Sequence, residues 1–149
     1  MTIAGVAPKI AIPTFIYMII AIIIDYLTKP LFKITQNYYS TLVVLGILLV
    51  LIGIIMVIIV AKNLLKSFNA NILMTDSLYK IVRNPMYSAY LILIIPGICF
   101  LFNSWLVLTS VIINYILLQI LIKEEYKYLE EKFGEEYKMY LGKVWIKYL

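Results

Sequence analysis

Four long stretches of almost uninterrupted apolar residues limit the folds that this chain can adopt. They cover residues 10–28, 41–61, 87–102 and 105–122. A run of about 20 apolar residues is long enough to cross the hydrocarbon core of a bilayer as a helix. Because lipid offers no hydrogen bonds to the backbone, a spanning segment must be a helix or belong to a closed barrel. The sequence therefore predicts an all-α, integral membrane helical bundle of about four transmembrane helices, with residues 1–149 forming a single membrane domain.

The composition supports this fold class and argues against several functions. Hydrophobic residues make up 64% of the chain and charged residues 14%, whereas soluble domains have about 25% charged residues. The net charge of +5 does not indicate a nucleic-acid partner, because the lysines stand at the ends of apolar runs and there meet lipid headgroups. With no histidine and a single cysteine, Cys99, we expect neither a metal site nor a histidine-dependent hydrolase.

Small and polar residues within the apolar runs predict local features of the bundle. Gly46 and Gly53 in the second run should let a neighbouring helix approach closely. Pro96-Gly97 in the third run should kink the helix or open it locally. Asp25, near the end of the first run, is expected to reach the membrane interface.

The last part of the chain, residues 123–149, is rich in charges and tyrosines. One apolar and aromatic face recurs there at three- and four-residue steps, through Tyr126, Leu129, Phe133, Tyr137 and Tyr140. Lysines and glutamates fill the opposite side. This pattern predicts an amphipathic helix that lies on the membrane or caps the bundle, with a break at Gly134.

The positive charges predict the orientation of the chain. With four spans, eleven of the lysine and arginine residues fall on the face that holds the N-terminus, residues 62–83 and the tail, and two fall on the other face. Loops rich in lysine and arginine stay in the cytoplasm. We therefore predict a multi-pass protein of the cell membrane with cytoplasmic N- and C-termini, and with segments 78–88 and 123–149 on the cytoplasmic side.

Two polar elements are candidates for a site. Segment 78–88 contains the chain's one arginine, Arg83, and Glu124-Glu125 follows one pair of apolar runs later. A very short connection at Asn103-Ser104 makes these two helices antiparallel and brings the charged elements together. Ionisable groups at this depth are costly unless they are paired or used. The charges therefore mark either a ligand site or an Arg–Glu ion pair that clamps two helices in a non-catalytic membrane protein.

Aromatic residues surround these charges. Tyr79, Tyr87, Tyr126 and Tyr128 offer ring faces for a heterocycle or a cation, although most tyrosines of such a chain belong to an interfacial belt. Pro85 can start the next helix, whose free N–H groups suit an anion. Carboxylates, a guanidinium and ring faces together would suit a zwitterionic nucleoside.

A longer pattern carries a family resemblance. In chain order it comprises Tyr79, Val82-Arg83-Asn84-Pro85, Tyr87, a hydrophobic helix pair, Glu124-Glu125, Leu129, Phe133-Gly134, Tyr137 and Tyr140. This order and spacing resemble the isoprenylcysteine carboxyl methyltransferase and phospholipid methyltransferase superfamily of integral membrane enzymes. The resemblance covers residues 79–140. Asn84 stands where the motif usually has histidine, so that an amide contact replaces any ring contact there.

The resemblance implies a methyltransferase that depends on S-adenosylmethionine, with Arg83 and Glu125 as catalytic residues. The glutamates would meet the ribose or the amino group of the cofactor, and Arg83 would hold its carboxylate or orient the acceptor. The implied cofactor-binding set comprises Tyr79, Val82, Arg83, Asn84, Pro85, Tyr87, Glu124 and Glu125.

The resemblance also implies a lipophilic small molecule or lipid as acceptor, with membrane lipids as surroundings. Since no general base is visible, a carboxylate or thiol acceptor is favoured, as in the isoprenylcysteine enzymes, because it arrives as its own nucleophile. Three alternatives remain: a phospholipid N-methyltransferase, a sterol-reductase-like NADPH enzyme, and a non-catalytic membrane protein. The reductase motif has Gly-Glu after its tyrosine, where this chain has Ser88-Ala89. The abundance of Ile, Lys and Asn is typical of a prokaryotic genome of low GC content.

Overall fold

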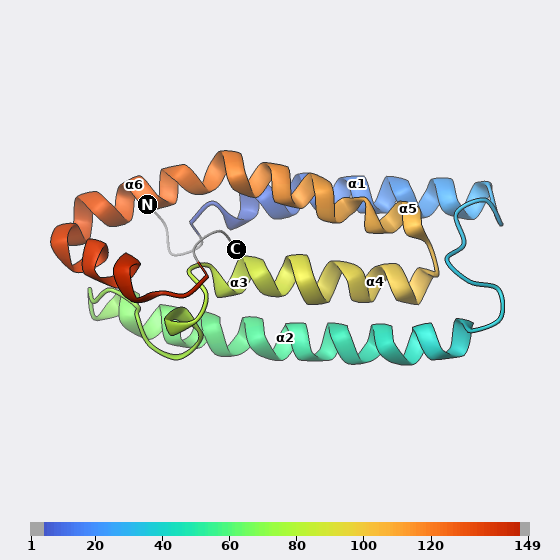
Figure 1. The fold of residues 1–149 in the computed structure, drawn as a ribbon. Helices are drawn as coiled ribbons and strands as arrows, with labels where there is room; N and C mark the ends of the chain where they lie inside the picture. Colours follow the sequence, from blue (N-terminus) through green and yellow to red (C-terminus); the bar gives the residue numbers. More distant parts are fainter. Residues whose placement is uncertain (1–4, 147–149) are drawn as a thin grey trace.

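The structure is a bundle of long helices (Figure 1), and the computed structural model describes residues 5–146. The first residues of the chain and the end of the predicted tail lie outside this range. Four helical units are long and apolar enough to cross a membrane, and the residues between 5 and 146 contain no strand beyond two isolated bridges. The predicted all-α membrane bundle is confirmed.

The first two units are single helices, and the next two are assembled from shorter pieces. The first is α1 (Ala7–Leu27) and the second is α2 (Tyr39–Asn69). After the 3₁₀ turn η1 (Ser77–Lys80), the third unit joins α3 (Pro85–Ala89), the π-helical turn η2 (Tyr90–Ile94) and α4 (Ile95–Phe102). The fourth unit joins α5 (Trp105–Leu108) and α6 (Ser110–Lys143). Figure 1 shows α3 and α4 lying along α2, with α1 beside α6.

Glycines of α2 set its distance from the third unit, at α4 and at η2. A Cβ atom built on Gly46 would lie 2.7 Å from the carbonyl oxygen of Gly97, and one on Gly53 would lie 2.6 Å from Cγ1 of Ile94. A side chain at either position would push the helices apart, so that the close approach depends on glycine. The packing role predicted for Gly46 and Gly53 is therefore confirmed.

The expected disturbance around Pro96 takes the form of a π-helical turn. Pro96 has no N–H to donate to the carbonyl four residues earlier, and η2 comes directly before the helix that Pro96 helps to begin. Such π turns insert into α-helices without ending them. The third unit therefore remains one continuous span.

The fourth unit extends far beyond the apolar run. α6 continues as one helix through the charged residues that follow, and its backbone leaves helical geometry only at Gly134, with φ 48° and ψ −118°. The predicted break at Gly134 is confirmed, whereas the tail helix before it is the continuation of the span and not a separate element. Figure 1 shows the residues after Gly134 turning back toward the beginning of α3.

Asp25 faces the interior of the bundle and is 4% exposed. That it lies at the depth of the membrane interface stays a prediction. The buried positions of α1 are Ile10, Thr14, Met18, Ala21 and Asp25, which recur at three- and four-residue steps and form one stripe. Asp25 falls on this stripe and is buried with it. The same stripe meets α6, where the Asn114 amide donates to the Thr14 hydroxyl at 3.1 Å.

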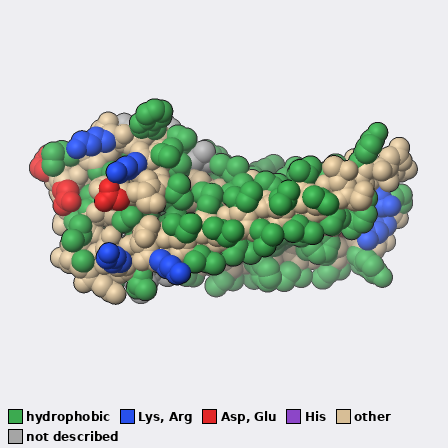
Figure 2. Space-filling model, turned by 90° about the horizontal axis from the view of Figure 1, so that it is seen from below, with side chains coloured by type: hydrophobic (Ala, Val, Ile, Leu, Met, Phe, Trp, Pro, Cys, Tyr) green, Lys and Arg blue, Asp and Glu red, His purple; other side chains and the backbone are tan. Residues whose placement is uncertain are grey.

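The surface separates an apolar body from charged ends. In Figure 2 hydrophobic side chains cover the middle of the molecule, the acidic side chains gather with lysines at one end, and the other end shows lysines alone. Many of the exposed isoleucines and leucines belong to α1 and α2. This apolar body is the surface expected of a protein surrounded by lipid.

Candidate functional site

A cavity of about 460 Å³ lies at the charged end of the bundle. Its walls come from α6, from the loop and turn that precede α3, and from the ends of α1 and α2. The volume is within the range of small-molecule sites, about 300–1,000 Å³. The cavity therefore joins segments that are far apart in the sequence.

Five residues of the predicted site line this cavity. They are Tyr79, Arg83, Asn84, Tyr87 and Glu125. Tyr79, Arg83 and Asn84 come from the segment that leads into α3, Tyr87 comes from α3 itself, and Glu125 comes from α6. The structure therefore brings together the two polar elements that the sequence placed at neighbouring helix ends.

The other three predicted residues lie outside the cavity lining. Glu124 forms an ion pair with Lys9, with 2.6 Å between Oε2 and Nζ, and both side chains are more than half exposed. Val82 is bridged to Ile146 of the C-terminal segment. Pro85 is fully buried and begins α3, where the proline ring fits the first helical position.

Arg83 contacts two tyrosines. Its Cζ atom lies 3.2 Å from the centroid of the Tyr126 ring, and Nη2 donates to the hydroxyl of Tyr137. The ion pair between Arg83 and a glutamate, which was one of the two expectations, is not formed within residues 5–146. The Nε of Arg83 is buried and has no hydrogen-bond partner within that range. Arg83 therefore keeps one N–H donor that the described protein groups do not use.

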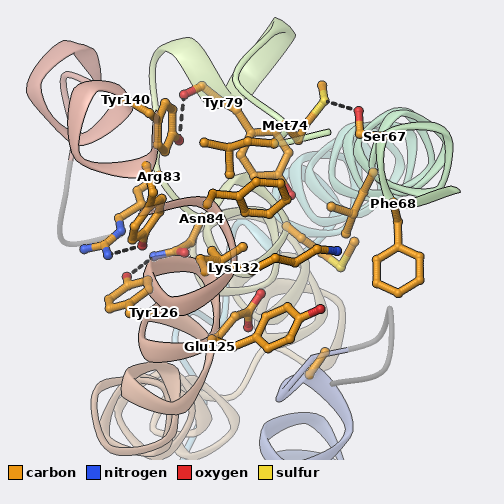
Figure 3. Close-up of a pocket in the computed structure, with 18 of the residues that line it drawn as sticks. Ser67, Phe68, Met74, Tyr79, Arg83, Asn84, Glu125, Tyr126, Lys132 and Tyr140 are labelled. Atoms are coloured by element: carbon orange, nitrogen blue, oxygen red, sulfur yellow. Dashed lines mark hydrogen bonds between the residues drawn. The ribbon is translucent and has the colours of Figure 1, made fainter. Parts of the chain in front are cut away.

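Two hydrogen bonds connect the beginning of α3 to α6 across the cavity. The Tyr87 hydroxyl donates to Oε2 of Glu125 at 3.0 Å, and the Asn84 amide donates to the Tyr126 hydroxyl at 2.6 Å. Figure 3 shows Asn84, Tyr126 and Glu125 on one side of the cavity. The bond from Tyr87 orients the Glu125 carboxylate, and the bond from Asn84 joins the residue before Pro85 to α6.

The C-terminal segment holds the arginine loop through its backbone. The Arg83 N–H donates to the Ile146 carbonyl at 2.9 Å, and the Ile146 N–H donates to the Ile81 carbonyl at 2.9 Å. The Tyr140 hydroxyl donates to the Tyr79 carbonyl at 2.9 Å. These bonds depend on the turn at Gly134, which directs the chain back over the loop.

Tyr79 is a neutral group in this wall. Burial, and then the negative charge of Glu125, raise the pKa of the Tyr79 phenol above its ordinary value. Both effects disfavour the phenolate. Tyr79 therefore presents an uncharged ring and a hydroxyl at physiological pH.

Part of the cavity wall has no counterpart in the predicted site. α2 contributes Ala61, Leu64, Leu65 and Phe68, and α6 contributes Lys132. The apolar residues of α2 carry no signal in the sequence, because they look the same as residues that face lipid. Lys132 has a weak signal, since it lies one helical turn after Tyr128 and so shares that face.

No metal is assigned to the cavity. Within the described part of the chain, no group of three or more cysteine, aspartate or glutamate side chains comes together. The chain has no histidine to add to such a group.

Comparison with known proteins agrees with the motif. A family model described as phospholipid methyltransferase matches residues 40–136, about two thirds of the chain. The match runs from α2 through the third unit and along α6, and so includes most of the cavity wall. Neither the search of curated proteins nor the search of solved structures gave a match. The resemblance noted in the sequence is confirmed, and the chain belongs to the phospholipid methyltransferase family.

Proposed function

We propose that this membrane methyltransferase uses S-adenosylmethionine as its methyl donor and that the cavity beside Glu125 binds this cofactor. The observation that carries the proposal is the convergence of Tyr79, Arg83, Asn84, Tyr87 and Glu125 on one cavity. These are the residue types that a zwitterionic nucleoside requires, and they come from the two ends of the family motif.

The chemistry of the wall supports the fit. Glu125 is the one carboxylate on the wall within the described part of the chain, and it suits the ammonium group or the ribose hydroxyls of the cofactor. Arg83 lines the cavity, and its guanidinium suits an anion. Tyrosine rings offer faces for the purine and for the sulfonium.

The protein's part in methyl transfer is binding and orientation. When bound, the cofactor supplies an activated methyl group on a sulfonium. Tyr87 holds the Glu125 carboxylate in one orientation, and apolar residues of α2 and α6 line the cavity beside it. Proximity and desolvation of this kind account for much of the acceleration of a displacement reaction.

We propose the amine headgroup of a phospholipid as the acceptor. The family's description supports a phospholipid, whose headgroup amine would attack the methyl group in its neutral form. A second candidate is the carboxylate or thiol acceptor expected from the absence of histidine, because a Glu125 engaged with the cofactor leaves no base for an amine. The reductase alternative has no support from the family match, and the helix-clamp alternative lacks its Arg–Glu pair among residues 5–146.

The first test compares Glu125→Gln with Glu124→Gln in detergent-purified protein. Calorimetry should show binding of S-adenosylmethionine and S-adenosylhomocysteine to the wild type and a loss of about tenfold or more for Glu125→Gln, as expected when a hydrogen bond to a charged group is lost. Glu124→Gln is the matched control, because Glu124 lies outside the cavity, and it should bind as the wild type does.

Absence of binding to folded wild-type protein would refute the cofactor assignment. Equal losses in the two variants would refute the role of Glu125. Transfer of labelled methyl groups to phosphatidylethanolamine or to a prenylcysteine lipid then distinguishes the two acceptor candidates.

A further inference from the structure

Lys132 extends into the cavity and lies among three aromatic rings. Its Nζ is 5.4 Å from the ring centroid of Phe68, 5.8 Å from that of Tyr128 and 5.1 Å from that of Phe133. Figure 3 shows the side chain reaching across the cavity toward Phe68 of α2. A cation within about 6 Å of a ring is attracted to its face. The rings therefore hold the Lys132 ammonium at this position.

Lys132 differs from Lys127 and Lys138, the lysines before and after it on α6, because it forms no ion pair with a described carboxylate. Lys127 pairs with Glu131 at 3.8 Å, and Lys138 pairs with Glu135 at 2.9 Å. Among residues 5–146, Lys132 is in none of the ion pairs. An ammonium group has three donors, and ring faces do not replace a full acceptor. Lys132 is therefore free to bind an anion.

The balance of charge in the cavity favours an anionic ligand group. The charged residues on the described wall are Arg83, Lys132 and Glu125, which leaves one positive charge in excess. S-adenosylmethionine adds a sulfonium and an ammonium against one carboxylate. An acceptor that brings a negative charge would therefore offset the excess.

The position of the cavity along α2 matches the depth of a lipid headgroup. α2 has no charged residue before Lys62 and Lys66, and such first charges mark the edge of the hydrocarbon region. Ala61 and Leu65, which line the cavity, lie at this level. A lipid whose acyl chains lie along the apolar part of α2 would therefore have its headgroup at the level of the cavity, where Lys132 lies.

From these observations we infer that Lys132 binds the phosphate of a phospholipid acceptor and so positions its headgroup for methylation. This inference rests on the proposed function. The phosphate accepts hydrogen bonds from the ammonium as a point charge, while Phe68, Tyr128 and Phe133 keep the lysine side chain in place. Recognition of the phosphate would exclude lipids that carry an amine but no phosphate.

The competing explanation is a lysine that only extends toward the interface and has no ligand. Such lysines bury an apolar stem and keep the charge in water, and replacing them affects membrane association in general. Lys127 provides the matched control, because it stands on the same helix, outside the cavity lining. Lys127→Gln also removes one lysine charge from α6.

The test measures binding of dihexanoyl phosphatidylethanolamine, of its phosphate-free diacylglycerol counterpart and of soluble glycerophosphoethanolamine to the purified full chain. Lys132→Gln should weaken phosphatidylethanolamine binding by about tenfold or more, the loss expected for one charged hydrogen bond. The affinities of the Lys132→Gln variant for the phosphate-free lipid, dihexanoylglycerol, and for S-adenosylmethionine should equal those of the wild type. Lys132→Arg should retain lipid affinity, and Lys127→Gln should behave as the wild type. In a methylation assay the KM for phosphatidylethanolamine should rise while kcat is kept.

Four results would overturn the inference. These are no phospholipid binding by the wild type, unchanged binding by Lys132→Gln, an equal loss for the phosphate-free lipid, and an equal loss in Lys127→Gln. Glycerophosphoethanolamine that binds as tightly as the lipid would assign the site to a soluble phosphate ester instead. If the wild type binds no S-adenosylmethionine, the proposed function fails, but the lipid measurements still decide the role of Lys132.

Discussion

Glu124 and Glu125 are adjacent residues with different surroundings. Successive side chains on a helix point in directions about 100° apart, since a turn takes 3.6 residues. One of the pair can therefore face the cavity while the other faces the solvent. Glu125 meets Tyr87 at the cavity wall, whereas Glu124 meets Lys9 at the surface. At the scale of single residues, the rotation of α6 about its axis determines which carboxylate serves the site.

Arg83 combines a stacked ring contact with a hydrogen bond, in a planar geometry that the compact ammonium of lysine does not reproduce. The flat guanidinium stacks on Tyr126 and donates to Tyr137, whereas an ammonium is compact and has no planar face. We predict that Arg83→Lys lowers the affinity for S-adenosylmethionine by about tenfold, the effect of losing one hydrogen bond to a charged group. Calorimetry gives the affinity, and helix content by circular dichroism gives the control. Wild-type affinity in this variant would show that charge alone suffices at this position.

α6 acts both as a membrane span and as a wall of the cavity. Its first part carries the apolar run, and its later part carries Glu125, Tyr126 and Lys132. The turn at Gly134 then directs the last residues back, so that Tyr137 reaches Arg83. At the scale of elements, one glycine connects the straight part of the helix to the segment that covers the arginine loop.

Gly134 should therefore be sensitive to substitution although it has open space around it. Apart from its neighbours along the helix, no atom of residues 5–146 lies within 4 Å of a Cβ built there, but its φ is +48°. A side chain at such a backbone position costs about 1–3 kcal/mol. We predict that Gly134→Ala favours a straight α6, detaches Tyr137 and Tyr140 from the loop, and weakens S-adenosylmethionine binding without loss of helix content.

Gly142→Ala is the control for this prediction. A Cβ at Gly142 also meets no atom of the described residues within 4 Å beyond its neighbours along the helix, and its φ is not positive. Binding and thermal unfolding of the two variants should be measured together. Equal behaviour of the two alanine variants would mean that the backbone angle at Gly134 does not control the site.

The whole molecule has its cavity at the end where acidic and basic side chains gather (Figure 2). The uneven distribution of lysine and arginine predicts that this end is cytoplasmic. A cytoplasmic cavity would open on the compartment in which S-adenosylmethionine is made. Orientation is therefore a property of the molecule that bears directly on the proposed function.

Labelling of single cysteines tests the orientation. Cys99 is buried and is replaced by serine, after which Gln36→Cys and Asp76→Cys place exposed thiols in loops at opposite ends. In intact cells a membrane-impermeant maleimide should label Gln36→Cys, and it should label Asp76→Cys only after the cells are opened. The reverse pattern would contradict the predicted orientation and place the cavity outside the cytoplasm.

The features that could be predicted from the sequence depend on composition or on neighbours along the chain. The membrane bundle follows from the length of the apolar runs, the close helix contact from Gly46 and Gly53, and the turn from Gly134 within a helical pattern. The motif likewise identified the family. Each of these signals is read from the order and spacing of residues along the chain and needs no knowledge of how the segments are packed.

The features that the sequence left open depend on how each helix is rotated about its axis and on which distant segment it meets. These include the tyrosine partners of Arg83, the separation of Glu124 from Glu125, the burial of Asp25 and the inward direction of Lys132. A helical pattern specifies which residues share a face, but the packing of α1, α2 and α6 around the third span specifies what that face contacts. The physical reason is that such contacts join residues far apart in the chain, and the bundle sets their distances as a whole.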